Sequence, residues 1–318
     1  MNGVTKLQCS PRERLIAVLL ALFALAGQGT SRAEPPPDFW RYWGDGKAEL
    51  DGYALVEPRY GAPRAGTAVL IFVTEDFSDA LHVKADPGKH PAADVYPVLK
   101  LNFVRAFQTG IYDYHLLTSV FTRIDAGFAT VKASFGSQEW CGNVYQQWLV
   151  RGDELSGTLH SYFDGEADRG VSGKLPADGI FEEALPIALR GLKGDFLPPG
   201  GQRDVQLFGS AIRARFEHKP QSWVKATIRR GATTAERSVQ SALGRLPAIE
   251  YTIEEAGGPT TTYVIEAAYP HRILEWRSTG GESGRILGSA RLPYWQLNAP
   301  GGEKELAKIG LKPQAAAK

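Results

Sequence analysis

Cysteine is scarce in this chain. The sequence contains two, Cys9 and Cys141, and Cys9 lies in an N-terminal segment that we expect to be removed. A mature chain with Cys141 alone cannot form an intramolecular disulfide, even in an oxidising compartment. Its stability must come from a packed core, and about 285 mature residues are ample for one large domain or two modest ones.

The N-terminal segment lacks a hydrophobic run long enough to span a bilayer. Residues 15–26 form an apolar run of 12 residues, whereas a spanning helix needs about 20. Basic residues precede the run and small residues follow it, an order typical of a cleaved export signal. We expect cleavage near Ala33; an uncleaved membrane anchor is the alternative. Because Cys9 lies upstream of the run, we expect no lipid anchor and a periplasmic or extracellular location.

A basic charge field is missing as well. The net charge is +1, and removal of residues 1–33 changes it to −2. Nucleic acid is not an expected partner, because phosphate binding needs concentrated Lys and Arg. The expected partner is instead a lipid, a glycan or another envelope protein, with no cofactor and no transmembrane segment after signal cleavage. The GxSxG, P-loop, HExxH and CxxC spacings are also absent, which removes the enzyme classes that are most commonly recognised from a sequence motif.

What the sequence does contain is a strand-and-turn pattern. Short runs rich in Val, Ile, Thr, Tyr and Phe are separated by Gly, Pro and Asp clusters, as in antiparallel proteins. We therefore expect a mostly β (β-rich α+β) fold of curved antiparallel sheets or half-barrels. The expected strands are 47–57, 66–75, 97–107, 112–123, 129–137, 143–151, 155–163, 203–208, 211–217, 222–230, 247–255, 260–267, 271–278 and 284–292.

One covering helix is expected near 179–190. Asp178 is a good N-cap, and Phe181, Leu185 and Leu189 share one face, although Pro186 should kink or shorten the helix. A Pro- and Gly-rich segment follows and suggests an internal boundary; one sheet or two domains both stay open. The expected organisation is a signal peptide (1–33), a Pro-rich linker (34–39), an N-terminal β-rich domain with the helix (40–195), a C-terminal antiparallel β region (203–296) and a tail (297–318).

Cys141 and His160 are the first candidates for chemistry, with Glu139 close to the thiol. An imidazole can lower the pKa of a thiol and accept its proton, as thiol nucleophiles require. The opposing interpretation is a structural cysteine, because Cys is among the most buried residue types. We expect the second: a buried, inert thiol packed near Trp140 and the strand that follows.

Two further groups of residues are candidates for binding. Asp164, Glu166 and Asp168 alternate in a Gly-containing turn, and alternating oxygens can wrap a hard cation such as Ca²⁺. The distal glutamate of a calcium loop is missing, so a solvated turn is the preferred interpretation. Aromatic residues crowd the first half, where rings could hold a sugar or a lipid, or simply pack in the core. The ligand-binding candidates are Trp40, Trp43, Trp140 and Tyr162.

Several segments of the first half together carry a family resemblance. They are 42–53 (YWGDGKAELDGY), 59–61 (RYG), 73–77 (VTEDF), 97–102 (PVLKLN), 109–112 (TGIY), 137–142 (SQEWCG) and 160–168 (HSYFDGEAD). In these segments the chain resembles a family of exported bacterial proteins of unknown function, whose members often carry the name "septum formation inhibitor Maf". The resemblance covers most of residues 40–192 and implies export, but no particular activity.

The name itself implies an activity that the sequence disfavours. True Maf proteins are cytosolic nucleotide pyrophosphatases with a Ser-Pro-Arg-Arg motif in a phosphate-handling loop. Here residues 10–13 read SPRE inside the expected signal peptide, and no α/β alternation follows. The strand-rich pattern is more similar to curved-sheet envelope carriers such as the Lol lipoprotein carriers, a likeness of fold alone.

These observations lead to two hypotheses of different classes. The first is an exported, non-enzymatic envelope protein that binds an apolar or glycan ligand in a curved sheet. The second is a periplasmic hydrolase that uses Cys141 with His160, or the group of Asp164, Glu166 and Asp168. Catalysis by the thiol requires its sulfur and an imidazole nitrogen within hydrogen-bonding reach in an accessible cleft.

Overall fold

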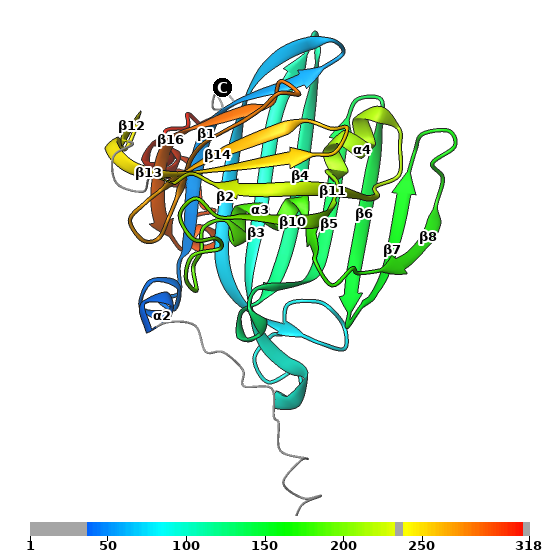
Figure 1. Ribbon diagram of the computed structural model, residues 1–318, viewed down its shortest axis with the longest axis horizontal. Coiled ribbons are helices and arrows are strands. Elements are labelled where there is room, and N and C mark those ends of the chain that lie inside the picture. The colour runs from blue at the N-terminus through cyan, green and yellow to red at the C-terminus, as the bar shows by residue number, and fades with distance from the viewer. Residues whose placement is uncertain (1–36, 233–237, 314–318) are drawn as a thin grey trace, which may run out of the picture. The chain divides into compact units, whose positions relative to one another are not determined.

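A computed structural model describes residues 37–232 and 238–313. In this part of the chain, sixteen strands form one curved sheet that does not close (Figure 1). All paired neighbours are antiparallel except β9 and β10, which are parallel. The expected mostly β fold is therefore confirmed. The expected signal peptide (1–33) and the first residues of the expected linker lie outside the described residues.

The order of the sheet is β8-β7-β6-β5-β4-β3-β2-β1-β16-β15-β14-β13-β11-β10-β9, and β12 adds to β13. The strands are β1 (Ala48–Arg59), β2 (Ala62–Ser78), β3 (Val95–Thr109), β4 (Tyr112–Arg123), β5 (Ala129–Glu139), β6 (Gly142–Arg151), β7 (Glu154–Ser161), β8 (Arg169–Lys174), β9 (Gly179–Phe181), β10 (Gln202–Phe208), β11 (Trp223–Arg230), β12 (Ser238–Ser241), β13 (Gly244–Glu255), β14 (Thr260–Glu266), β15 (Ile273–Ser278) and β16 (Ser283–Leu292).

Helical segments are short. The α-helices are α2 (Pro37–Trp43), α3 (Leu185–Ala188) and α4 (Ala211–Glu217), and the 3₁₀ turns are η1 (Ala92–Asp94), η2 (Ile124–Ala126), η3 (Glu182–Ala184), η4 (Tyr294–Gln296) and η5 (Gly302–Ile309). No helix within the described ranges is long and apolar enough to cross a bilayer.

The two halves of the chain belong to one continuous sheet. The first eight strands follow one another as antiparallel neighbours, and β1 then pairs with β16, where Leu50 lies opposite Ala290. The Pro- and Gly-rich segment 195–202 connects α3 to β10 within this sheet. The question of one sheet or two, which the sequence left open, is answered by the pairing of β1 with β16.

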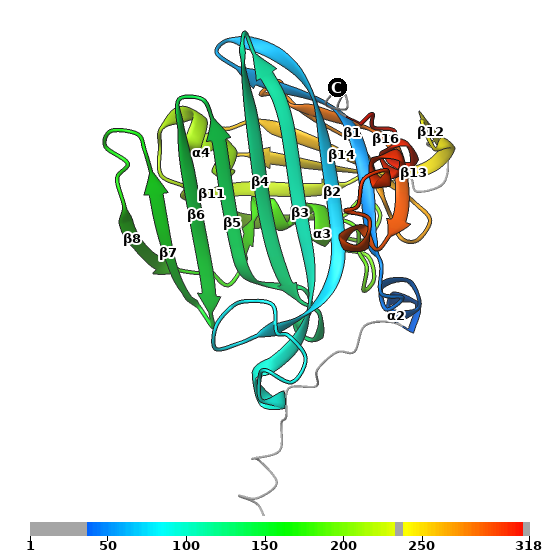
Figure 2. The same cartoon turned by 180° about the vertical axis from the view of Figure 1, so that it is seen from behind.

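The core lies between two layers of this sheet. Figures 1 and 2 show the long strands β2–β8 in one layer and β10, β11, β13 and β14 in the other. Aromatic side chains meet across the interior: the ring centroids of Phe103 and Trp276 are 5.4 Å apart, and those of Trp148 and Phe208 are 5.1 Å apart. Both contacts are edge-to-face, an arrangement favoured by the aromatic quadrupole.

The helix expected near 179–190 is much shorter than predicted. Residues Gly179–Phe181 pair with β10 as strand β9, a 3₁₀ turn follows, and α3 spans Leu185–Ala188 with Pro186 in its first turn. Proline is tolerated in a first turn because the N–H there has no helical acceptor. α3 is buried within the core rather than covering the sheet from outside.

Residues 211–217, expected as a strand, form α4 instead. The segment alternates apolar and polar residues from Ile212 to Glu217, which is the pattern of a half-buried strand. Ser210 caps the helix, because its Oγ accepts from the backbone N–H of Arg213 at 3.3 Å, and His218 ends it in the left-handed conformation. Local capping and the fit of one face into the interior therefore outweigh the alternation.

One end of the sheet gathers many of its turns. The antiparallel order places the β1–β2, β3–β4, β5–β6 and β7–β8 connections at this end. The β13–β14 and β15–β16 turns lie there too, because Val56 near the end of β1 is opposite Ser283 at the start of β16. The β10–β11 connection, which contains α4, joins them since Ala226 pairs with Glu255. This end holds the pocket described below.

The C-terminal segment η5 docks on β1 and β16. Ile309 is buried in a small cluster with Leu50 and Val73. Glycine is required beneath it: a Cβ atom at Gly52 would lie 2.1 Å from the carbonyl oxygen of Ile309, and one at Gly288 would lie 2.7 Å from its carbonyl carbon. The absence of two side chains thus lets the segment lie directly on the sheet.

We expect Gly52→Ala to lower the free energy of unfolding by about 1–3 kcal/mol, because the new methyl group overlaps backbone atoms that cannot move aside cheaply. Gly136→Ala, in the interior of β5, is the matched control, since its Cβ would meet nothing within 4 Å. Limited trypsin digestion should cleave the Gly52→Ala variant faster at Lys304 and Lys308. Equal cleavage and equal stability of the two variants would contradict the docking.

Candidate functional site

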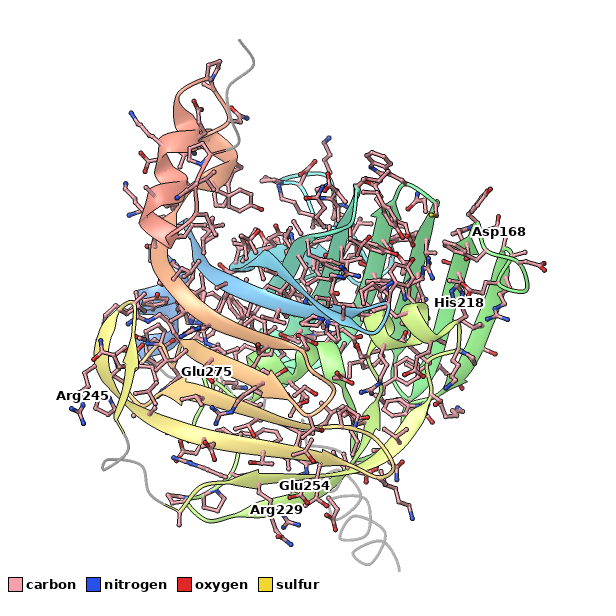
Figure 3. The ribbon with its side chains drawn as sticks, turned by 90° about the horizontal axis from the view of Figure 1, so that it is seen from above. Asp168, His218, Arg229, Arg245, Glu254 and Glu275 are labelled. Carbon is pink, nitrogen blue, oxygen red and sulfur yellow. The ribbon has the colours of Figure 1, made fainter. Side chains whose placement is uncertain are left out.

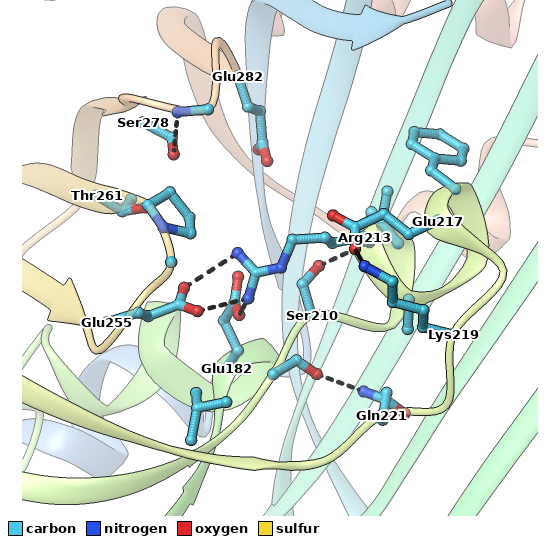
Figure 4. A pocket seen from close by; sticks show the side chains of 18 of the residues that line it. Glu182, Ser210, Arg213, Glu217, Lys219, Gln221, Glu255, Thr261, Ser278 and Glu282 are labelled. Atoms are coloured by element: carbon cyan, nitrogen blue, oxygen red, sulfur yellow. Dashed lines mark hydrogen bonds and ion pairs between the residues drawn. The ribbon is translucent and has the colours of Figure 1, made fainter.

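A pocket of about 680 Å³ opens at the end of the sheet where the turns gather. Its walls come from the end of β1, from α4 and the connection that follows it, and from the β13–β14 and β15–β16 turns (Figure 4). The side chains in its wall that carry charge are Glu57, Glu182, Arg213, Glu217, Lys219, Glu255 and Glu282.

The pocket continues inward to a smaller space of about 50 Å³. Glu182, Thr261 and Glu282 line both. The inner space adds the aromatic side chains of Phe103, Tyr263 and Trp276, together with Arg105 and Glu183. The pocket therefore has charged and hydroxyl groups at its mouth and aromatic side chains at its inner end.

Arg213 joins three elements of the wall. It lies in α4, and Figure 4 shows its guanidinium reaching across to Glu255 and Glu182. Nη1 and Nη2 donate to the two oxygens of Glu255 at 3.1 and 2.7 Å, and Nη2 also lies 3.3 Å from Oε2 of Glu182. The forked geometry of arginine suits such bidentate contacts. α4 is thereby tied to η3 and to the end of β13.

The opposite wall contains a second polar group of side chains. Glu282 Oε1 accepts from Nη2 of Arg105 at 3.0 Å and from the indole N–H of Trp276 at 2.7 Å. Glu57 is 3 % exposed, and its Oε2 is buried without a hydrogen-bond partner among the described residues. A buried acceptor without a donor is costly, which marks Glu57 as a group that a ligand could satisfy.

Glu183 holds the base of α4. Its Oε1 accepts from the backbone N–H of Ala211 at 2.8 Å and from Nε2 of Gln221 at 3.4 Å. Gln221 in turn accepts from the indole N–H of Trp148 at 2.8 Å. Glu183 thus links the start of the helix to the long-strand layer, which fixes the position of Arg213 in the pocket.

Burial changes the protonation of these carboxyl groups. It raises the pKa of Glu57 to about 8, with Arg105 opposing the shift and Glu282 adding to it. Burial likewise raises the pKa of Glu182 to about 8, opposed by Arg213, and that of Glu183 to about 7, opposed by the hydrogen bond from Ala211. Three groups that are ordinarily ionised are therefore largely or partly protonated at neutral pH. Perturbed carboxyl groups in a cleft are a mark of functional sites.

The thiol expected to be buried is instead exposed. Cys141 and Trp140 form the turn between β5 and β6, and a two-residue turn has no face that could pack against the sheet. His160 lies on β7 and pairs with Asp168, Nδ1 to Oδ1, at 3.1 Å. No hydrogen bond joins Cys141 to His160 in the described residues. Glu139 is buried and pairs with Arg215 of α4 at 2.5 Å.

We expect Cys141 to react rapidly with a maleimide reagent in the native protein, because its side chain lies at an exposed turn. Intact mass before and after labelling without denaturant measures the extent, and Cys141→Ser is the control that assigns the site. Labelling that requires denaturant would contradict the exposed position and restore the buried thiol predicted from the sequence.

Two of the three acidic residues in the β7–β8 connection, Glu166 and Asp168, engage different neighbours. Glu166 pairs with His218, Oε1 to Nδ1, at 2.5 Å and accepts from Ser161 Oγ at 2.9 Å, whereas Asp168 pairs with His160. Figure 3 shows Asp168 and His218 beside the edge of the sheet formed by β7 and β8. Across residues 37–232 and 238–313, no group of three or more His, Cys, Asp or Glu side chains, including Asp164, is placed to hold a metal ion.

The four aromatic candidates do not line the pocket. Trp43 is fully buried in the core, and Trp40 is 41 % exposed on α2. Trp140 and Tyr162 are 67 % and 75 % exposed in the β5–β6 and β7–β8 turns, at the same end of the sheet as the pocket, but neither lines it. The structure thus separates the two pairs, and other aromatic residues form the floor of the pocket.

Sequence reasoning missed every charged residue of the pocket wall. Its members come from β1, β3, η3, α4, the end of β13 and the β15–β16 turn, so no fixed spacing connects them. The adjacent acids Glu182 and Glu183, placed between Phe181 and the apolar run that begins at Ala184, are the one local signal that could have pointed to buried carboxyl groups.

Comparisons with known proteins add nothing to what the chemistry of the site indicates. No family model, no curated protein and no solved structure matches this chain. The resemblance to the exported Maf-named family therefore stays a prediction of the sequence.

Proposed function

We propose that the protein acts outside the cytoplasm as a binding protein, and that it holds a small hydroxylated ligand of the glycan class in the pocket beside α4. The observation that carries this proposal is the pocket itself, whose volume of about 680 Å³ lies in the range of small-molecule sites. Donors, acceptors and aromatic rings all contribute to its walls.

The chemistry of the walls favours a glycan over an apolar ligand. Arg213, Gln221 and Thr261 offer donors, and Glu255 and Glu282 offer acceptors. A sugar ring presents hydroxyl groups that can serve both, and its apolar face can stack on aromatic rings. An apolar ligand would remove water from these charged groups without replacing their hydrogen bonds, which costs free energy.

Titration calorimetry with a panel of neutral and amino oligosaccharides tests the proposal, and native mass spectrometry of the protein purified from the periplasm searches for a bound ligand. Arg213→Met should weaken binding at least tenfold. Arg229→Met is the matched control, because Arg229 pairs with Glu254 on the outer surface of β11 and β13 (Figure 3). Absence of binding across the panel and of any co-purified ligand would contradict the proposal.

Hydrolysis in the same pocket is the second candidate. Glu182, whose pKa burial raises to about 8, carries a proton at neutral pH, as a general acid must. Glu255 contacts the same guanidinium group and is placed to act as its carboxylate partner. Shortening of an oligosaccharide over time, lost in Glu182→Gln, would establish hydrolysis; recovery of intact ligand after long incubation leaves binding alone.

A further inference from the structure

Both arginines of the pocket wall already have carboxylate partners. Arg213 contacts Glu182 and Glu255, and Arg105 contacts Glu282. Guanidinium groups that are neutralised in this way attract an anionic ligand weakly. The third cation of the wall, Lys219, pairs with Glu217 at 2.9 Å. Each described cation of the wall therefore already has a carboxylate partner.

Glu57 has the opposite character. The residue is 3 % exposed and lines the pocket, and its Oε2 has no hydrogen-bond partner among the described residues. The charged groups that face it are Arg105, from β3, and Glu282, from the β15–β16 turn. Arg105 donates to Glu282 through Nη2, and its Nε is itself buried without an acceptor, so no described group donates to Oε2 of Glu57 and a ligand could supply that donor.

We propose that the pocket selects a ligand that carries a protonated amine, and that the ammonium group is held between Glu57 and Glu282. The inference rests on the pocket being the ligand site, as proposed above, and names the class of ligand it takes. An ammonium group brings three donors and a positive charge. It can therefore donate a hydrogen bond to the unpaired oxygen of Glu57 and also balance the negative charge of the neighbouring carboxyl groups. A sugar hydroxyl brings one donor and no charge.

A bound metal ion would be the other way to neutralise this wall. It is a poorer fit, because no group of three or more acidic or histidine side chains in the described ranges is placed to coordinate one. An organic ammonium group needs no closed coordination shell. Two carboxyl groups, with the aromatic side chains of Tyr263 and Trp276 in the inner space beneath, suit such a group, because cations are also attracted to aromatic faces.

The inference makes a thermodynamic prediction that a neutral ligand does not share. Burial raises the pKa of Glu57 to about 8, so at pH 7 the empty pocket holds this group mostly protonated. An ammonium ion favours the carboxylate form. Binding at pH 7 should therefore transfer the carboxyl proton from Glu57 to the buffer, while the ammonium group keeps its own proton.

The test uses the full-length mature protein and three probes: glucosamine oligomers, N-acetylglucosamine oligomers of the same length, and spermidine. Titration calorimetry at pH 7 in two buffers of different ionisation enthalpy measures the affinity and the number of protons released. Glucosamine oligomers should bind at least tenfold more tightly than the acetylated ones. Spermidine, whose amines are fully protonated at pH 7, should release close to one proton when it binds. Glu57→Gln should lose both the preference and the proton release, whereas Glu254→Gln, on the outer surface, should keep them.

Glu57→Gln should fold, because it replaces a buried carboxyl group by a neutral one of the same shape, and thermal unfolding checks this directly. Equal affinity for both sugar series would overturn the amine inference and leave the glycan proposal standing. Binding of spermidine with no binding of either sugar would support the amine site and overturn the glycan proposal. Binding of none of the probes would overturn both.

Discussion

Arg190→Met is expected to lower the free energy of unfolding by about 3–5 kcal/mol, the usual cost of leaving a buried charge without its partner. Arg190 follows α3 and is 1 % exposed; its Nη1 lies 2.7 Å from Oε1 of Glu49, which is fully buried on β1. Its Nε and Nη2 donate to the carbonyl oxygen of Pro270 at 3.1 and 2.8 Å. The substitution would strand Glu49 in the core.

The neighbouring Asp51 explains why Glu49 depends on this arginine. Burial, followed by the charge of Glu49, raises the pKa of Asp51 well above its ordinary value, and the charge of Arg190 opposes this shift. Arg190 is therefore the cation that faces two neighbouring buried carboxyl groups. Urea denaturation at constant m-value measures the effect. Arg285→Met, at an exposed position of β16, is the control. Adding Glu49→Gln to Arg190→Met should restore part of the loss, and a loss below 1 kcal/mol in the single variant would contradict the argument.

Stability should fall as the pH rises from 5 to 8, by on the order of 3 kcal/mol for each of Glu57 and Glu182. Both groups have an ordinary pKa of 4.5, and burial raises it to about 8 in the folded protein. Between these values the folded state binds more protons than the unfolded state. Raising the pH therefore favours unfolding, and the fall levels off above pH 8, once both groups are ionised in the folded state as well.

A buried histidine, His82, and a partly buried one, His271, act in the other direction and must be separated from this effect. Burial lowers the pKa of His82 and of His271, so their contribution to stability rises with pH up to their ordinary value of 6.5. The difference between wild type and Glu57→Gln removes this background. The difference should shrink toward pH 5 and favour the variant at pH 8, with Glu254→Gln parallel to wild type. A difference independent of pH would contradict the raised pKa.

Most of the strands follow from the sequence alone. Residues 112–123 form β4 as predicted, and the turn at Gly152 and Asp153 joins β6 to β7 as its composition suggests. Alternating burial and turn chemistry are properties of neighbouring residues, so they are visible locally. The failures have local causes as well: α4 carries the alternation of a strand, and β9 takes the first residues of the expected helix into the sheet.

Whether a side chain is buried is harder to predict from the sequence than the strand or turn that carries it. Cys141 was expected to be buried because of its residue type, whereas its place in a two-residue turn leaves it in solvent. Trp43 and Trp140, which looked equivalent as candidates, lie in the core and at an exposed turn. Burial depends on where an element ends and on what lies across from it, and residue type predicts neither.

The sequence by itself determined the β class and most of the strand positions, because each rests on local pattern or composition. The pocket was decided by the tertiary structure. Glu57, Arg105, Glu182, Arg213, Glu255 and Glu282 are spread over more than two hundred positions of the chain. The pairing of β1 with β16 and the capping of α4 bring them together, and their burial among one another creates the raised pKa values on which the proposed chemistry depends.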